Sequence, residues 1–220
     1  MRTLFFKREI YKLEFNLIKY NSMIIWIDLD EILAELVESL LEQNNYYIWW
    51  RKLHFEDITD YYIYNIEGVK LSIDEAIDVF RKTLYSDIEK LEIKPVKWVY
   101  NKLKEWKEKW YKLKVITARP GDLFEKYTLD WLDKHYPNIF DEVYFANNWK
   151  HISDDGVDNT KKSVICQNLW VDVMIEDNPE YAKDVADCWI KTYLIKKPWN
   201  KNIWEVNNLI IVDGFENILI

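Results

Sequence analysis

The chain has 220 residues, of which 49% are hydrophobic and 31% are charged, and its formal net charge is −8. This composition is typical of a globular protein with a sizeable core and excludes a disordered chain. The negative charge argues against binding to a nucleic acid polymer, which requires a basic surface. It still permits a local cationic site for a small phosphate ligand.

Cysteine usage and hydropathy indicate the compartment. Cys166 and Cys188 are far apart and form no CxxC motif, so we expect reduced thiols rather than a disulfide. No apolar run approaches the ~20 residues of a membrane helix, and charged residues interrupt the N-terminal region where a signal peptide would be apolar. We therefore expect a cytoplasmic protein without a membrane partner.

The first segment, residues 1–22, is an N-terminal extension whose apolar residues fit a helix and a strand equally well, and we assign it no role. After it, six short apolar runs predict buried strands. They lie at 23–27, 113–116, 143–146, 171–175, 190–195 and 209–212. Residues 96–110 and 124–132 have the apolar spacing of helices.

This alternation of strands and helices predicts an α/β fold, a Rossmann-like parallel sheet with helices on both faces. The segment 34–93 is too long for one crossover connection. It contains the capping-box pattern Ser72-Ile73-Asp74-Glu75, which indicates a helix start. We interpret 34–93 as a helical cap inserted after the first core strand, and 23–33 with 94–220 as the core.

Polar residues follow the predicted strands, where the carboxyl ends of parallel strands meet and ligands bind. The first strand is followed by Asp28 and Asp30, the second by Thr117, the third by Asn147 and Asn148, and the fourth by Glu176, Asp177 and Asn178. Lys161 and Lys162 open the helix before the fourth strand. Acid, hydroxyl, lysine and acid are therefore expected at one edge of the sheet.

These motifs resemble those of the haloacid dehalogenase-like (HAD) phosphohydrolases. The matching segments are "DLDEI" at 28–32, Thr117 at a strand end, Lys162 at a helix start and "ED" at 176–177. The strings "TARP", "TLDWL", "KSVIC", "IEDNPEYA" and "KPWN" are similar to the 5′(3′)-deoxyribonucleotidase-like branch, over about residues 23–213. The chain departs from that branch at Glu31, where glycine is usual, and at Ile32, where valine or threonine is usual.

The resemblance implies hydrolysis of phosphate monoesters through a phospho-aspartate. Asp28 would be the nucleophile and a ligand of Mg²⁺. Asp30 would contribute its backbone carbonyl to the metal and its side chain as general acid and then general base. Asp177 would complete the metal site, with Glu176 as a second ligand or a support.

The same resemblance implies that Thr117 and Lys162 bind the phosphate oxygens, with Arg119 as a further candidate. For the lysine we favour Lys162 over Lys161, because Lys162 precedes the "SVIC" string. The substrate would be a small phosphate monoester, and the branch favours (deoxy)nucleoside monophosphates.

Two other functions remain open at this point. A catalytically weak HAD-like protein could bind a phosphate ligand or act as a regulator, and Glu31 beside the phosphate site keeps that alternative open. A phospho-acceptor signalling module also uses Asp, Thr and Lys at strand ends, but it places the phosphorylated Asp after the third strand, where this chain has Asn147. The aromatic cluster Tyr46, Tyr47, Trp49 and Trp50 is interpreted as packing, with base stacking as the alternative.

Overall fold

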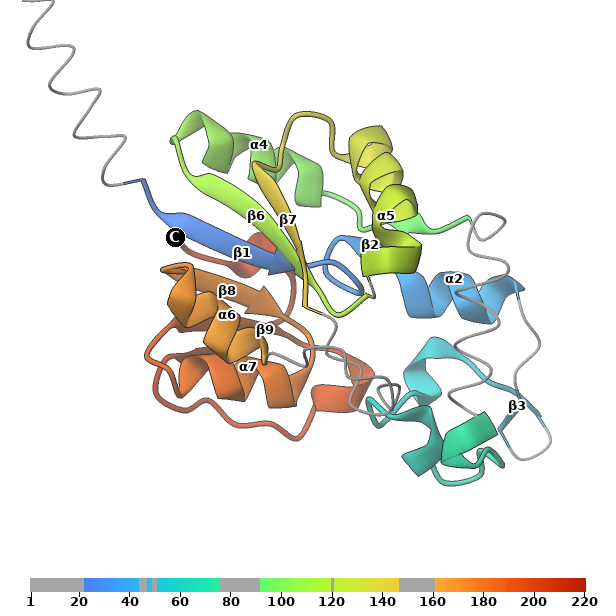
Figure 1. Cartoon of the computed structure of the whole chain (residues 1–220). Coiled ribbons are helices and arrows are strands. Elements are labelled where there is room, and N and C mark those ends of the chain that lie inside the picture. The colour runs from blue at the N-terminus through green and yellow to red at the C-terminus, as the bar shows by residue number, and fades with distance from the viewer. Residues whose placement is uncertain (1–21, 44–46, 49–50, 76–91, 120, 147–160) are drawn as a thin grey trace, which may run out of the picture.

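The computed structural model describes residues 22–43, 47–48, 51–75, 92–119, 121–146 and 161–220. Within them, one sheet has the strand order β10-β9-β8-β1-β6-β7, and each neighbouring pair is parallel (Figure 1). Its strands are β1 (Ile24–Asp28), β6 (Lys112–Thr117), β7 (Glu142–Phe145), β8 (Val173–Glu176), β9 (Lys191–Ile195) and β10 (Leu209–Val212). The predicted α/β fold with a parallel sheet is confirmed.

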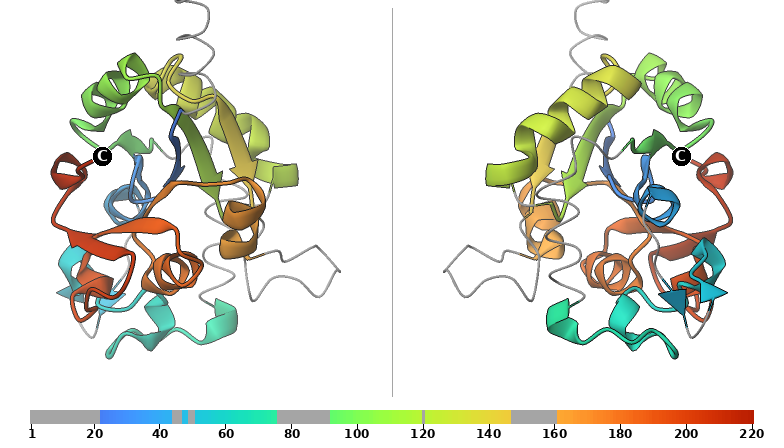
Figure 2. Two further views of the ribbon diagram at one scale, coloured as in Figure 1. Left: turned by 90° about the vertical axis from the view of Figure 1, so that its left-hand side faces the viewer. Right: turned by 90° about the vertical axis from the view of Figure 1, so that its right-hand side faces the viewer.

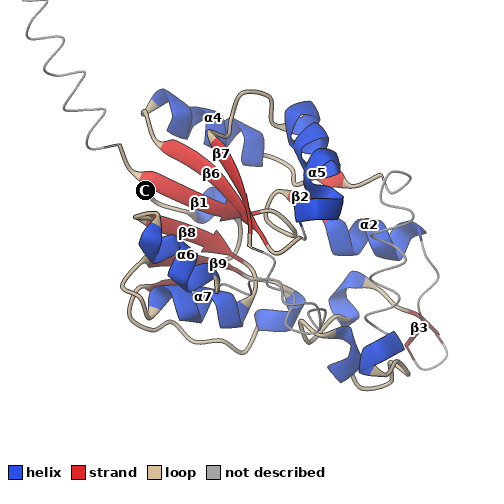
Figure 3. Ribbon diagram, in the orientation of Figure 1, coloured by secondary structure: helices blue, strands red, loops and turns tan. Residues whose placement is uncertain are grey.

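Helices alternate with these strands along the chain (Figure 3). They are α4 (Val99–Glu108), α5 (Gly121–His135), α6 (Lys162–Asn168) and α7 (Pro179–Ala186). In β1, Ile25 and Ile27 pack with side chains of α4 and α5, whereas Trp26 packs with side chains of α6 and α7. Because successive side chains of a strand point to opposite faces, the two helix pairs cover opposite faces of the sheet.

The position of β1 in the middle of the sheet sets the place of the site. The strand order runs outward from β1 in both directions, to β6 and β7 on one side and to β8, β9 and β10 on the other. In such open sheets, the crevice at the reversal of strand order, outside the carboxyl ends, is the usual ligand site. The carboxyl ends of β1 and β8 therefore form the expected position of the site.

The chain leaves the sheet after β1 and returns through a two-stranded antiparallel pair, β2 (Ala34–Glu35) with β5 (Lys94–Pro95). Between them lie α2 (Leu36–Gln43), β3 (Tyr47–Ile48), β4 (Arg51–Lys52), and the 3-10 helices η1 (Phe55–Asp57) and η2 (Ile63–Asn65). Figure 1 shows these elements beyond the carboxyl ends of the strands. From two further sides, Figure 2 shows residues 51–75 near α7 and far from α4.

The inserted segment agrees in part with its sequence pattern. Ser72 and Glu75 form the predicted capping box, with Glu75 N donating to Ser72 Oγ at 3.2 Å and Ser72 N donating to Glu75 Oε2 at 2.8 Å. Residues 76–91, which follow this capping box, lie outside the described residues, as do residues 1–21 of the N-terminal extension. The β3–β4 hairpin was not predicted. The boundaries of the cap remain a prediction.

Two 3-10 helices, η3 (Pro198–Asn200) and η4 (Phe215–Asn217), complete the described elements. Asn178 is the N-cap of α7, since its Oδ1 accepts hydrogen bonds from Glu180 N at 2.8 Å and Tyr181 N at 3.2 Å. This cap fixes the turn that directly follows β8. None of the helices in the described ranges has the length and apolar character needed to span a membrane.

Candidate active site

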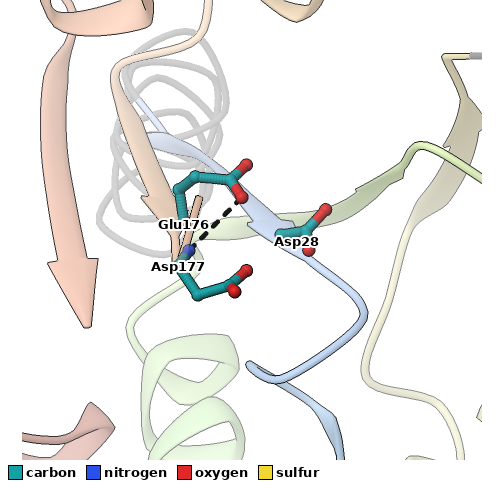
Figure 4. A group of neighbouring side chains, drawn as sticks. All are labelled: Asp28, Glu176 and Asp177. Carbon is teal, nitrogen blue, oxygen red and sulfur yellow. Dashed lines mark hydrogen bonds between the residues drawn. The ribbon is translucent and has the colours of Figure 1, made fainter. Parts of the chain in front are cut away.

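Three carboxylates meet at the carboxyl ends of β1 and β8. Asp28 is the last residue of β1, Glu176 is the last residue of β8, and Asp177 follows it. One carboxylate oxygen of each lies within 4.8 Å of the other two, and the residues are 6%, 1% and 3% exposed. Figure 4 shows their carboxyl groups converging on one space. The sheet thus brings together residues that are 148 positions apart in the chain.

Among the residues that the structure describes, Lys162 forms ion pairs with two members of this group. Its Nζ lies 2.5 Å from Asp28 Oδ1 and 2.8 Å from Glu176 Oε2, and the side chain is 2% exposed. The side chain of Lys161 is 68% exposed and lies 3.4 Å from Asp184. Of the two lysines left open by the sequence, Lys162 is therefore the one in the site.

The charges of this acidic cluster are not balanced. Burial and the neighbouring Glu176 raise the pKa of Asp28 to about 8, against the opposing effect of Lys162. Burial, followed by the charges of Glu176 and Asp28, also raises the pKa of Asp177 well above its usual value. If all three carboxyl groups were ionised, their negative charges would outnumber the single ammonium of Lys162, and the raised pKa values of Asp28 and Asp177 reflect this excess. Oxygen donors with this charge fit Mg²⁺, a hard divalent cation.

Asp30 lies outside the acidic cluster and pairs with Arg119. Arg119 Nε donates to Asp30 Oδ2 at 3.0 Å, and Arg119 Nη2 donates to Asp30 Oδ1 at 2.5 Å. The arginine is 3% exposed, and its Nη1 also donates to Thr128 Oγ1 at 3.2 Å. In this structure the guanidinium that we considered for phosphate binding is therefore engaged with the predicted acid–base residue.

Thr117 ends β6 beside these two residues. It is 1% exposed, and its Oγ1 accepts a hydrogen bond from Arg119 N at 3.1 Å. The turn after β6 is thereby fixed by the side chain at its start. Asn147 and Asn148, which we expected at the end of the third strand, lie outside the described residues, as do Tyr46, Trp49 and Trp50.

Glu31, the residue that departs from the usual glycine, has a left-handed backbone with φ 64. Its Oε1 accepts a hydrogen bond from Val37 N in the first turn of α2 at 2.6 Å, and its Oε2 lies 3.8 Å from Lys197 Nζ. Burial raises its pKa to about 7, although Lys197 and the Val37 amide act against this. Glu31 therefore connects the turn after β1 to the inserted segment.

Two hydrogen bonds of the site were not predicted from the sequence. Trp199 Nε1 donates to Asp177 Oδ2 at 3.1 Å, and Asn200 Nδ2 donates to the carbonyl oxygen of Asp177 at 2.8 Å. Both residues belong to the "KPWN" string, which was the only signal that could have drawn attention to them.

Tyr61 brings the inserted segment to the acidic cluster. The residue is 42% exposed overall, yet burial of its hydroxyl raises its pKa well above the usual value. The carboxylate of Asp177 adds to this rise, and the Asn178 side chain opposes it. A polar group from outside the sheet thus lies close to the proposed metal ligands.

No protein-family profile matches the chain, and no curated protein matches it in sequence. Solved structures do match. CbbY from Rhodobacter sphaeroides, in complex with phosphate, has a TM-score of 0.54 and 14% sequence identity, over 89% of this chain and 96% of that chain. A haloacid dehalogenase-like family hydrolase from Streptococcus pneumoniae has a TM-score of 0.52 and 15% identity, over 80% of this chain and 85% of that chain.

At these identities the comparisons show the fold alone. The chain has the Rossmann-like α/β fold of these HAD-like proteins, as the motifs predicted. A variant of CbbY was solved with xylulose-1,5-bisphosphate, with a TM-score of 0.54 to this chain and 14% identity, over 89% of this chain and 96% of that chain. The narrower resemblance to deoxyribonucleotidases remains a prediction.

Proposed function

We propose that the protein is a Mg²⁺-dependent phosphomonoesterase of small phosphate esters that acts in the cytoplasm. The observation that carries the proposal is the acidic cluster of Asp28, Glu176 and Asp177 with its single lysine. A buried group of this charge is costly for a protein without a cation, so its presence supports a bound divalent metal. Its position at the carboxyl ends of β1 and β8 supports a ligand site.

The proposed chemistry proceeds in two displacements. A carboxylate oxygen of Asp28 attacks phosphorus, the ester P–O bond breaks, and the leaving oxygen takes a proton from Asp30. Water then attacks the phospho-aspartate, its proton passes to Asp30, and inorganic phosphate leaves. Lys162 and the hydroxyl of Thr117 would bind the nonbridging oxygens throughout.

Asp28, Glu176 and Asp177 would hold Mg²⁺, together with the backbone carbonyl of Asp30. The bound ion would offset the repulsion between the Asp28 carboxylate and a dianionic phosphate. Arg119 acts differently from our first hypothesis in this scheme. Because its guanidinium already binds Asp30 through two nitrogens, we assign it to the orientation of the acid–base residue.

The substrate proposal rests on the inserted segment, because the residues around the phosphate site recognise only the phosphate. Tyr61 lies near the acidic cluster and could touch the remainder of a substrate. The sequence resemblance favours deoxynucleoside monophosphates, so we propose these as the preferred class. Sugar phosphates are the main alternative, since the CbbY variant was solved with a sugar bisphosphate.

The experiment is turnover of p-nitrophenyl phosphate, with Mg²⁺ and then with EDTA, followed by a screen of nucleotides and sugar phosphates. We expect Mg²⁺-dependent release of phosphate and faster turnover of deoxynucleoside monophosphates than of sugar phosphates. Binding of phosphate without turnover would favour the catalytically weak alternative. A long-lived acyl-phosphate on the protein would favour the signalling module. Full activity in EDTA, with trace metals shown absent, would overturn the metal assignment.

A further inference from the structure

Trp199 contacts two separate parts of the protein. Its ring packs in a cluster with residues of the inserted segment, namely Leu41, Leu53, Ile58 and Ile66. The ring of Phe55, from the same segment, meets it edge-on at a centroid distance of 5.6 Å. On its polar side, Nε1 donates a hydrogen bond to Asp177 Oδ2 at 3.1 Å. One side chain therefore joins the inserted segment to a proposed metal ligand.

This hydrogen bond restricts the orientation of the Asp177 carboxylate. Asn200 already fixes the backbone of Asp177 by donating to its carbonyl oxygen and to that of Ile195, at 2.8 and 2.9 Å. The hydrogen bond from the Trp199 indole N–H then restricts the rotation of the Asp177 carboxyl group about its side-chain bonds. Partners that hydrogen-bond a ligating carboxylate orient it for the metal.

We propose that Trp199 is a positioning residue for the divalent cation, and that packing in the inserted segment controls it. The proposal rests on the proposed function. The alternative is a purely structural role, in which Asp177 serves only as the hydrogen-bond acceptor that a buried indole N–H requires. Trp199→Phe distinguishes the two, since it retains most of the ring packing and removes the donor.

The test measures Mg²⁺ binding by calorimetry on the full chain without substrate. We expect Trp199→Phe to weaken Mg²⁺ binding by about 10–100-fold, the usual effect of losing such a partner. Trp106→Phe is the matched control, because Trp106 is also buried and packs on Phe215 at 5.3 Å in another part of the core. Equal affinities in these two variants would overturn the proposal, provided both melt close to the wild type.

A second variant tests the role of the inserted segment. Phe55→Ala removes a ring that packs on Trp199, and we expect it to weaken Mg²⁺ binding by a smaller factor. An unchanged Mg²⁺ affinity in Phe55→Ala would overturn the proposal that packing in the inserted segment controls Trp199. If the wild type binds Mg²⁺ but hydrolyses no ester, the proposed function fails while the positioning role stands. A wild type that binds no Mg²⁺ overturns both.

A second and independent inference concerns other tryptophans. The chain has 12, and those with described side chains form two groups. Four are at most 8% exposed: Trp26, Trp106, Trp131 and Trp199. Five are at least 62% exposed: Trp98, Trp110, Trp170, Trp189 and Trp204. Tryptophan is highly buried on average, so the second group is unusual.

Four of the exposed tryptophans also have a left-handed backbone. Their φ values are 69 at Trp98, 65 at Trp110, 55 at Trp170 and 65 at Trp189. A bulky residue in this region is an outlier, because its Cβ crowds the following carbonyl. Each of the four buried tryptophans has a negative φ. Exposure and backbone strain therefore coincide at the same positions.

The hydrogen bonds around these tryptophans show which residue type the backbone conformation favours. After α4, Trp110 N donates to Lys107 O at 2.9 Å and Tyr111 N donates to Trp106 O at 3.1 Å. After α6, Trp170 N donates to Gln167 O and Val171 N donates to Cys166 O, at 3.3 and 3.1 Å. This is the Schellman motif, whose left-handed residue is usually glycine.

The other two positions also suit glycine, although neither forms the full Schellman motif. Trp189 follows α7, and its N donates to Ala186 O at 3.0 Å. Trp98 is the N-cap of α4, a position where glycine is well tolerated. The whole chain has only 4 glycines, whereas an average composition of about 7% would correspond to about 15.

We infer that positions 98, 110, 170 and 189 carry glycine in the organism that makes this protein. The codon UGA, a stop in the standard code, is translated as tryptophan in some variant genetic codes and as glycine in others. A chain read with the first meaning would show tryptophan wherever the cell inserts glycine. The four buried tryptophans would come from UGG, which encodes tryptophan in both.

The gene and the natural protein test this inference together. We expect UGA at the four strained positions and UGG at the four buried ones, and glycine in peptides from the natural protein sequenced by mass spectrometry. UGG or tryptophan at the strained positions would overturn it. In recombinant protein, we expect the fourfold change to glycine at 98, 110, 170 and 189 to raise the melting temperature. As a control, Trp26→Gly should lower it.

Discussion

Arg119 and Asp30 form a two-nitrogen ion pair, with Nε and Nη2 at 3.0 and 2.5 Å from the two carboxylate oxygens. The arginine is 3% exposed and the Asp30 side chain is 25% exposed, so the buried partner orients the accessible one. The planar fork of a guanidinium fixes both the position and the rotation of a carboxylate. An ammonium cannot do this, because it is a point charge.

Arg119→Lys should therefore reduce kcat while the protein stays folded. We expect a loss of about 10- to 100-fold, the effect of misplacing a reacting group by about 1 Å. The measurement is steady-state hydrolysis of p-nitrophenyl phosphate with Mg²⁺. Arg51→Lys is the matched control, because Arg51 makes a similar two-nitrogen pair with Asp57, at 2.6 Å for each nitrogen, away from the acidic cluster. Similar losses in the two variants would contradict the role of Arg119.

Asp28→Asn should abolish turnover, since an amide cannot attack phosphorus in place of the carboxylate. Loss of a nucleophile typically costs several orders of magnitude in kcat. The variant should also fail to form a radiolabelled acyl-phosphate in a quenched reaction. A purified variant that keeps more than about a tenth of the wild-type rate would exclude Asp28 as the nucleophile.

Asp30→Asn should depend on the substrate. Removal of a general acid costs roughly 10²–10⁴-fold when the leaving group needs a proton. The p-nitrophenolate leaving group needs little protonation, so we expect a smaller loss on p-nitrophenyl phosphate than on a nucleoside monophosphate. Losses of the same size on both would remove Asp30 from the acid role.

Glu31 should make stability depend on pH. Its pKa is about 7 in the folded protein, above the ordinary value of 4.5. The stabilisation that the protonated Glu31 carboxyl contributes is therefore fully present below pH 4.5 and is lost as the pH rises through about 7, because the unfolded chain ionises first. The full loss from this shift is about 3 kcal/mol. The glutamine of the Glu31→Gln variant cannot ionise. The free energy of unfolding of this variant should therefore rise relative to that of the wild type as the pH increases from 4.5 to 8.

The measurement is urea denaturation of both proteins across this pH range, in the presence of EDTA. The difference between the two curves isolates Glu31 from the other carboxylates of the site. Two parallel curves would show that the Glu31 carboxyl is not protonated in the folded protein at neutral pH.

The fold could be predicted because its strands are short apolar runs bounded by polar residues. The run 209–212 matches β10 in full, whereas β8 begins at Val173 and not at residue 171. The difference has a local cause, since Val171 N closes the turn after α6 by donating to Cys166 O. The hairpin of β3 and β4 was missed because each strand has only two residues, too few for a periodic pattern.

The site was predictable where it follows strand ends and unpredictable where it depends on side-chain direction. Asp28, Glu176 and Asp177 meet because parallel strands share one edge. Nothing in the order of residues indicates that Arg119 turns toward Asp30, which is 89 positions away. The same holds for Trp199 and Asp177, since their hydrogen bond depends on a rotamer fixed by packing.

The antiparallel pairing of β2 with β5 separates the inserted segment from the sheet. Ala34 pairs with Pro95, so both ends of the insertion leave the core about one strand spacing apart, near 5 Å. A loop with fixed, adjacent ends can change in length at low entropic cost. In evolutionary terms, the segment 36–93 can be lengthened, shortened or replaced without a shift in the register of the central strands. If the proposed function holds, substrate preference can then diverge between descendants of one ancestor while Asp28, Lys162 and Asp177 keep their positions.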